Sequence, residues 1–177
     1  AVAFSADSST LVTASEDNTL GVWRLQDPIA LLTTLRGHTG KVRDVAISPD
    51  GETIVSASDD TTVRLWRLRH PALTVLRGYE SSLTGIAFLR RDRTWFVSSN
   101  DGTIARWHED GRRLETIESE QNPWALAVSP DERLMGVGVG ERMVVLYNLK
   151  GEMERSLSGH TDIVWSVDFH PDGQLFL

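Results

Sequence analysis

The sequence predicts an all-β fold assembled from repeated four-stranded antiparallel sheets. Short runs rich in Val, Ile and Thr alternate with turn residues along the 177-residue chain, which is typical of β-strands. Residues 37–76 hold four such runs, and one small sheet cannot bury both of its faces alone. An aromatic residue recurs at spacings of 43, 41 and 40 residues, at Trp23, Trp66, Trp107 and Tyr147. We therefore expect an array of similar sheets.

Two further markers keep the same period. An acidic residue stands six positions before each aromatic residue, at Asp17, Asp60, Asp101 and Glu141. A Gly-His pair or its equivalent opens the repeats at His38, Tyr79 and His160. Three independent markers with one period indicate that the whole chain is a repeat array.

The period, the Gly-His opening and the closing Asp-x-x-x-x-x-Trp resemble the WD-repeat family of β-propellers. The resemblance covers about four and a half repeats and implies a β-propeller of four-stranded antiparallel blades. We expect a partial or open ring of four full blades plus half a fifth. The expected blades cover about residues 1–35, 42–76, 83–117 and 124–157, with a partial blade at 164–177.

Each expected strand is bounded by turn signals. In the first blade the strands are residues 1–4, 10–15, 19–25 and 30–35, and in the second they are 42–47, 53–58, 62–68 and 73–76. Turns of the Ser-Pro-Asp type separate the first two strands of a blade, for example at Asp50. The partial blade would supply two strands, residues 164–169 and 174–177.

A half blade would expose unpaired strand edges and an apolar face, which native proteins avoid. We therefore expect one of two arrangements. Either the remaining blades of a longer chain close the ring, or the chain self-assembles with other copies.

The composition is typical of a globular protein that needs no disulfide bonds, with 40% hydrophobic residues, 24% charged residues and no cysteine. No apolar run approaches the roughly 18 residues of a membrane span. The net charge of −7 argues against general nucleic-acid binding, which requires neutralisation of phosphates. We expect a cytoplasmic protein without a membrane span and without a nucleic-acid partner.

His38, Ser56 and Asp60 are the residue types of a Ser-His-Asp hydrolase. The family resemblance implies a different role, a buried structural network in which these three residues join the indole of Trp66. The histidines show no metal-ligand spacing, and the GVGVG run lacks the context of a phosphate-binding loop. We therefore expect no enzyme activity, no metal and no cofactor.

The resemblance also implies that partners dock on the face where the loop into the first strand and the turn into the third strand emerge. Two tryptophans at equivalent places on consecutive blades suggest an interface hot spot. Alternatively, both turn inward to plug the channel mouth or to pack on neighbouring blades. The expected partner-binding residues are Lys41, Arg43, Asp59, Thr84, Asn100, Asn122, Trp124 and Trp165.

A second candidate surface is the arginine-rich stretch 64–93, which could receive an acidic peptide, a phosphate or an anionic lipid, or could be a plain solvated rim. Two functions fit the whole sequence. The first is a protein–protein interaction scaffold that binds peptide or protein partners on its loop faces. The alternative is a regulatory or sensing module of a larger multidomain signalling enzyme.

Overall fold

The computed structural model describes residues 1–68, 72–119, 121–140 and 142–173. These residues form sixteen strands in four separate antiparallel sheets, each with its four strands in chain order. None of the described segments is a helix that is long and apolar enough to cross a membrane. The predicted all-β architecture of repeated four-stranded sheets is confirmed.

Each sheet is one blade of the repeat. Blade 1 consists of β1 (Val2–Phe4), β2 (Thr10–Ala14), β3 (Thr19–Arg24) and β4 (Ala30–Arg36). Blade 2 consists of β5 (Val42–Ile47), β6 (Thr53–Ser58), β7 (Val63–Arg67) and β8 (Ala72–Leu76). Blade 3 consists of β9 (Leu83–Leu89), β10 (Thr94–Ser99), β11 (Thr103–His108) and β12 (Arg113–Glu118). Blade 4 consists of β13 (Pro123–Val128), β14 (Leu134–Val139), β15 (Met143–Asn148) and β16 (Met153–Ser158).

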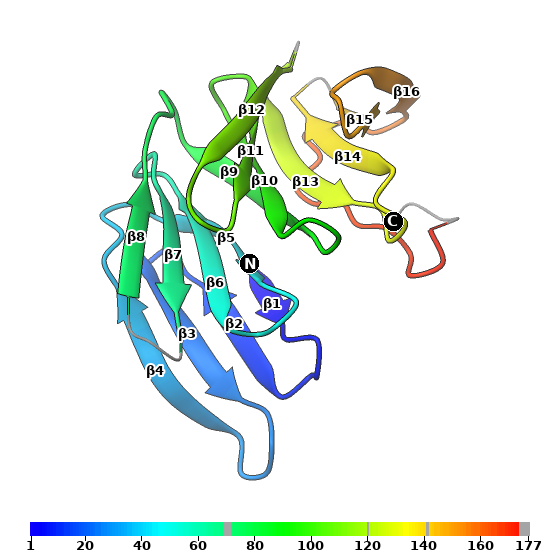
Figure 1. The fold of residues 1–177 in the computed structure, drawn as a ribbon. Helices are drawn as coiled ribbons and strands as arrows, with labels where there is room; N and C mark the ends of the chain where they lie inside the picture. Colours follow the sequence, from blue (N-terminus) through cyan, green and yellow to red (C-terminus); the bar gives the residue numbers. More distant parts are fainter. Residues whose placement is uncertain (69–71, 120, 141, 174–177) are drawn as a thin grey trace.

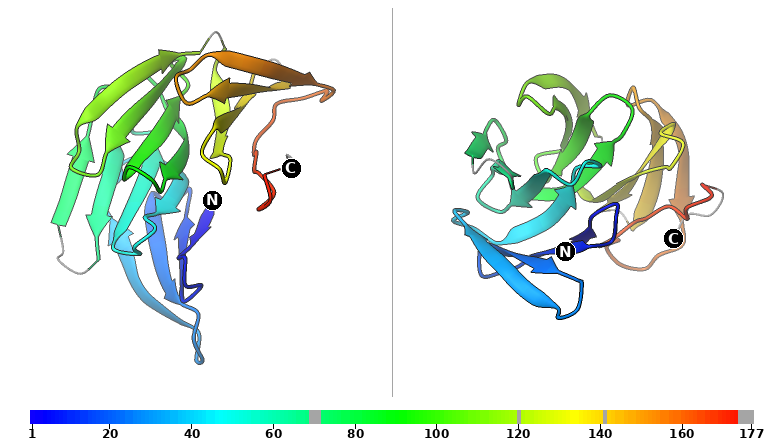
Figure 2. Two further views of the ribbon diagram at one scale, coloured as in Figure 1. Left: turned by 45° about the vertical axis from the view of Figure 1, so that its right-hand side comes forward. Right: turned by 60° about the horizontal axis from the view of Figure 1, so that its bottom comes forward.

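The four blades follow one another along an arc, with the first strand of each blade on its inner side (Figures 1 and 2). The inner strand β1 lies beside β5, β5 lies beside β9, and β9 lies beside β13. The last strand of each blade, β4, β8, β12 or β16, lies at the outer edge. The architecture is therefore that of an open propeller.

The core lies between consecutive blades. Val12 of blade 1 packs in one cluster with Trp66 of blade 2, and Val55 of blade 2 packs in another with Trp95 of blade 3. A third cluster, which includes Phe96, joins blades 3 and 4. Burial of one such large apolar side chain contributes about 1.5–3 kcal/mol. A blade therefore depends on its neighbours for much of its stability, which explains why the sequence repeats.

The sequence predicts the first strand of a partial blade at residues 164–169, and the structure does not form this strand. The segment forms only an isolated bridge at Phe169, although Val164 and Val167 are buried against blade 4. A strand needs a hydrogen-bonded neighbour, and the predicted neighbour, residues 174–177, lies outside the described residues. The apolar pattern was thus sufficient to predict packing but not a β-ladder.

Three inner strands share an irregularity that the sequence did not reveal. The pairing of β5 with β6 shifts between Val42 and Asp44, so that Arg43 is left out of the ladder. The pairing of β9 skips Thr84 in the same way, and that of β13 skips Trp124. A β-bulge of this kind turns the extra side chain away from its regular direction. Blades 2, 3 and 4 thereby each present one re-aimed residue.

Candidate partner-binding site

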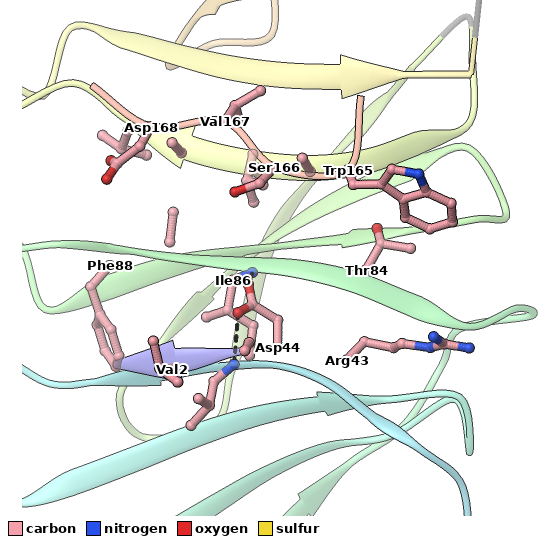
Figure 3. A pocket seen from close by; sticks show the side chains of 17 residues that line it. Val2, Arg43, Asp44, Thr84, Ile86, Phe88, Trp165, Ser166, Val167 and Asp168 are labelled. Atoms are coloured by element: carbon pink, nitrogen blue, oxygen red, sulfur yellow. Dashed lines mark hydrogen bonds between the residues drawn. The ribbon is translucent and has the colours of Figure 1, made fainter. Parts of the chain in front are cut away.

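The inner strands surround a central cavity of about 530 Å³, lined by residues of β1, β5, β9 and β13 and by residues 165–168. Figure 3 shows Arg43, Thr84 and Trp165 at one end of this cavity and Phe88 and Asp168 at the other. We call the end defined by Arg43, Thr84 and Trp165 the upper mouth. Arg43 and Thr84 are the extra residues of their bulges, and Trp165 occupies the equivalent place in the next repeat.

Charged side chains of blades 1 and 2 are paired beside the upper mouth. Arg43 donates two hydrogen bonds to Asp59, from Nε to Oδ1 at 2.8 Å and from Nη2 to Oδ2 at 2.7 Å. Lys41 Nζ donates to Glu16 Oε2 at 2.9 Å. The hydrogen bond from Arg43 lowers the pKa of Asp59, and the hydrogen bond to Asp59 raises that of Arg43. The two cations are therefore held in place with their charges balanced.

The predicted residues of blade 3 are largely engaged in the fold. The Thr84 hydroxyl donates to the carbonyl of Pro123 at 2.8 Å and lies 2.9 Å from Ser98 Oγ, which ties blade 3 to blade 4. The Asn100 amide donates to the carbonyl of Ser82 at 2.9 Å. Asn100 Oδ1 is buried and has no hydrogen-bond partner among the described residues. The Thr84 hydroxyl is thus fully engaged, whereas Asn100 Oδ1 is a hydrogen-bond acceptor without a partner among the described residues.

The two tryptophans of the prediction lie against each other. Their ring centroids are 5.1 Å apart at an angle of 71°, an edge-to-face contact. Gly140 lies beside the pair, and a Cβ there would be at van der Waals distance from Trp124, 3.4 Å from its Nε1. Trp124 is half-buried, whereas Trp165 is 65% exposed and lines the cavity. Asn122 is exposed beside them, and its carbonyl accepts the Gly140 amide at 3.2 Å.

A second set of predicted residues forms a chain of hydrogen bonds inside blade 2. Trp66 Nε1 donates to Ser56 Oγ at 2.9 Å, and Ser56 Oγ lies 2.8 Å from His38 Nε2. His38 Nδ1 lies 2.9 Å from Asp60 Oδ2. The pattern assigns the histidine proton to Nδ1, which donates to the carboxylate, while Nε2 accepts from the serine hydroxyl. The chain joins the loop before β5 to β6 and β7.

Burial sets the protonation states in this chain. Burial lowers the pKa of His38, an effect that outweighs its hydrogen bond with Asp60. Burial alone would raise the pKa of Asp60, but hydrogen bonds from Thr62, Thr39 and His38 outweigh it and hold that pKa at about 2. Ser56 is 0% exposed, so its hydroxyl is out of reach of any substrate. This Ser-His-Asp constellation therefore cannot act as a hydrolase site in this conformation.

Blade 3 replaces the chain with a direct contact. Blade 3 has Tyr79 at the position of the histidine and Val97 at the position of the serine. In the structure Trp107 Nε1 donates straight to the Tyr79 hydroxyl at 2.6 Å. Arg113 lies over both rings, 5.3 Å from the centroid of Tyr79 and 5.8 Å from that of Trp107. The larger tyrosine spans the gap that histidine and serine fill in blade 2.

The other two blades keep less of this chain. In blade 1 Trp23 Nε1 donates to Thr13 Oγ1 at 3.1 Å. In blade 4 Tyr147 is buried against apolar neighbours, and Glu141, at the position of the network aspartate, lies outside the described residues.

Acidic residues of blades 3 and 4 lie beside two arginines of the arginine-rich stretch. Arg93 Nη1 donates to Glu109 Oε1 at 2.8 Å, and Arg91 Nε lies 3.8 Å from Glu132 Oε2. Arg69 lies outside the described residues. The acids beside Arg91 and Arg93 make this rim less cationic than the sequence suggests.

Comparison with known proteins agrees with the repeat pattern. The family described as WD domain, G-beta repeat matches residues 1–24, 29–67, 71–108 and 151–177. The unmatched residues 109–150 include most of blade 4, where the hydrogen-bonded chain is not kept.

Several curated relatives carry the name eukaryotic translation initiation factor 3 subunit I. The protein from Neosartorya fischeri is 35% identical over 106 residues, which are 58% of this chain and 31% of that protein. Those from Aspergillus terreus and Lodderomyces elongisporus are 36% and 30% identical over 106 and 104 residues, covering 58% of this chain and 31% and 30% of the relatives. The match thus spans about a third of the length of these relatives. With family matches across most of its repeats, the chain belongs to the WD-repeat family.

Proposed function

We propose that this protein is an interaction scaffold that binds peptide or protein partners at the upper mouth of its central cavity. The observation that carries the proposal is the shared bulge of β5, β9 and β13, which re-aims Arg43, Thr84 and Trp124. Bulges recur next to functional sites, where they redirect a side chain without dismantling the sheet. The same bulge on three consecutive blades favours a shared role for these residues in binding.

The composition of this face supports the same function. Trp and Arg are the residue types most enriched among interface hot spots. Trp165 is 65% exposed, although a large aromatic side chain gains free energy from burial. Arg43 is held by Asp59 in one orientation, so that little side-chain entropy is lost when a partner binds.

The relatives support a role inside an assembly. Their name denotes one subunit of a translation initiation factor, and therefore a protein that works with other subunits. We propose by analogy that this chain contacts other proteins within a cytoplasmic multiprotein complex. Its partners and the role of that complex are part of the proposal, since the match covers 31% of the relative.

The test is selection of binding peptides from a random library displayed on phage, followed by affinity measurements with variants. Trp165→Ala and Arg43→Ala should each weaken binding of the selected peptides about tenfold or more. Met153→Ala and Arg155→Ala are matched controls on the outer strand β16, and Met153 is 65% exposed, as Trp165 is. The controls should leave the affinity unchanged within about twofold.

Two outcomes would contradict the proposal. One is a selection that yields no peptide with a reproducible affinity. The other is binding that the two β16 variants weaken and the two mouth variants leave intact, which would move the partner site to the outer edge.

A further inference from the structure

The central cavity contains uncompensated negative charge. Asp44 and Asp168 both line it, and neither forms an ion pair with any described residue. Two cationic groups lie in the lining. Arg43 is balanced by its two hydrogen bonds to Asp59, and the amino group of Ala1 offsets part of the charge of Asp44, so the two carboxylates leave the cavity with a net negative charge. A cavity with walls of low polarisability concentrates such a field, so it attracts a cation.

Asp44 is the deeper and better defined of the two carboxylates. Its Oδ2 accepts the amide of Ile86 at 2.7 Å and its Oδ1 accepts the amide of Val45 at 2.8 Å. A carboxylate offers about four acceptor sites, so these two bonds fix its orientation and leave capacity on both oxygens. Burial raises the pKa of Asp44 to about 6. A bound cation would therefore relieve an unfavourable burial of charge.

The route from the upper mouth to Asp44 begins at an aromatic side chain. Figure 3 shows Trp165 at the mouth, with Asp44 and Ser166 further along the cavity and Asp168 at its far end. Trp165 is fixed by its edge-to-face contact with Trp124. The face of a tryptophan ring attracts cations, and the planar guanidinium of arginine stacks on it.

We propose that the cavity binds an arginine side chain of the partner peptide, which passes Trp165 and places its guanidinium on the carboxylate of Asp44. The inference rests on the proposed function and specifies what the partner carries. Arginine fits better than lysine because its planar fork can meet both oxygens of one carboxylate, whereas an ammonium acts as a point charge. Asp168 adds a second negative charge at the far end of the cavity.

The test compares two acetylated, amidated pentapeptides, Ala-Ala-Arg-Ala-Ala and the same peptide with citrulline, a neutral isostere of arginine. Binding is followed by NMR through the indole N–H signals of the tryptophans in the ¹⁵N-labelled protein. The arginine peptide should shift the Trp165 signal saturably at concentrations up to about 10 mM, the range of a single-residue anchor. The citrulline peptide should bind at least about tenfold more weakly.

Asp44→Asn is the decisive variant, because asparagine keeps an oxygen that accepts an amide hydrogen but has no charge. In this variant the preference for arginine over citrulline should fall to about one. Asp162→Asn is the matched control, since Asp162 also accepts the amide of the next residue, at 2.7 Å, and does not line the cavity. It should keep the full preference. If Asp44→Asn does not fold, Asp168→Asn takes its place and should reduce the preference.

Three results would overturn the inference. These are equal binding of both peptides, no shift by the arginine peptide, or a preference for arginine that survives Asp44→Asn. If library peptides still bind at the upper mouth in any of these cases, the proposed function stands and the arginine pocket alone is wrong. If library peptides also fail to bind, the proposed function fails separately.

Discussion

His38 is held neutral at the centre of a buried chain of four polar side chains. The resemblance of repeat 2 to the WD-repeat family implied the members of the chain, and the structure brings them together. Each polar group then has a partner in an otherwise apolar blade. The sequence could not predict the substitute in blade 3. The direct bond from Trp107 to Tyr79 depends on the length of the tyrosine side chain in three dimensions, and repeat spacing does not encode that length.

Removal of the serine hydroxyl tests this chain. Ser56→Ala would leave both Trp66 Nε1 and His38 Nε2 without a partner in a fully buried place. The free energy of unfolding should fall by about 1–3 kcal/mol. Urea denaturation at neutral pH measures the effect, with the exposed Ser156→Ala on β16 as a control that should change stability by less than about 0.5 kcal/mol. An equal effect of the two substitutions would contradict a structural role of the chain.

Stability should also depend on pH through this chain. The pKa of His38 is lowered from 6.5, so the unfolded chain takes up the proton more readily and stability falls as the pH drops below about 6.5. The pKa of Asp60 is about 2 against 3.8 in a model peptide, so its contribution is present above pH 3.8 and is lost as the pH falls toward 2. Both groups therefore predict destabilisation by acid. Thermal unfolding of Asp44→Asn, which lacks the opposing carboxylate described below, measures it between pH 7.5 and pH 3. A stability of this variant that rises steadily as the pH falls would contradict it.

Asp44 should act in the opposite direction. Its pKa in the folded protein is about 6, so the folded state binds the proton more tightly and its ionisation costs stability as the pH rises from 3.8 through 6. The stability of Asp44→Asn relative to the natural protein should therefore be greater at pH 7.5 than at pH 4, by about 1–2 kcal/mol. Urea denaturation of both proteins at the two pH values gives this difference. A stability difference between the two proteins that is independent of pH would show that folding does not raise the pKa of Asp44.

At the scale of the element, the bulged inner strands give the clearest limit of sequence reasoning. The family resemblance implied Arg43 and Trp124 as partner-binding residues, and in the structure each is the unpaired residue of a bulge. The bulge itself could not be predicted, since an inserted residue next to a turn leaves the pattern of apolar residues in the strand unchanged. Its position became visible only through the cross-strand register.

The replaced chain in blade 3 can be tested by a double-mutant cycle. Tyr79→His alone should destabilise the protein because it leaves Trp107 Nε1 unpaired and opens a cavity. Val97→Ser alone should destabilise it by burying a hydroxyl without a partner. Together with Asp101 the two changes recreate the residue set of blade 2, so the double variant should recover at least about 1 kcal/mol relative to additivity. Additive losses in urea denaturation would contradict the equivalence of the two arrangements.

The segment after β16 depends on a glycine of β14. A Cβ at Gly138 would lie 2.9 Å from the carbonyl oxygen of Val164, which is too close for an unchanged backbone. Gly138→Ala should therefore displace residues 163–169 from blade 4 and raise their amide hydrogen exchange. Exchange in β5, β6 and β7 should stay the same. Unchanged protection of residues 163–169 would mean that the segment does not pack on blade 4 in solution.

At the scale of the whole molecule, the fold was predictable because one period governs the entire chain. Burial between consecutive blades explains that period, since no blade can cover both of its faces alone. The negative charge of the cavity could not be predicted from the repeat in this way. Asp44 and Asp168 stand at different places in their repeats, and it is the curvature of the arc that directs both toward one space.

The central claim is that partners bind at the upper mouth rather than at the outer edges of the blades. Hydrogen–deuterium exchange of the protein with and without a library-selected peptide tests it most directly. The account predicts protection confined to residues 41–44, 82–85, 122–125 and 163–166, with the opposite turns at 48–52 and 90–93 unchanged. Protection of those opposite turns or of the outer strands β4 and β16, with the mouth residues unaffected, would contradict it.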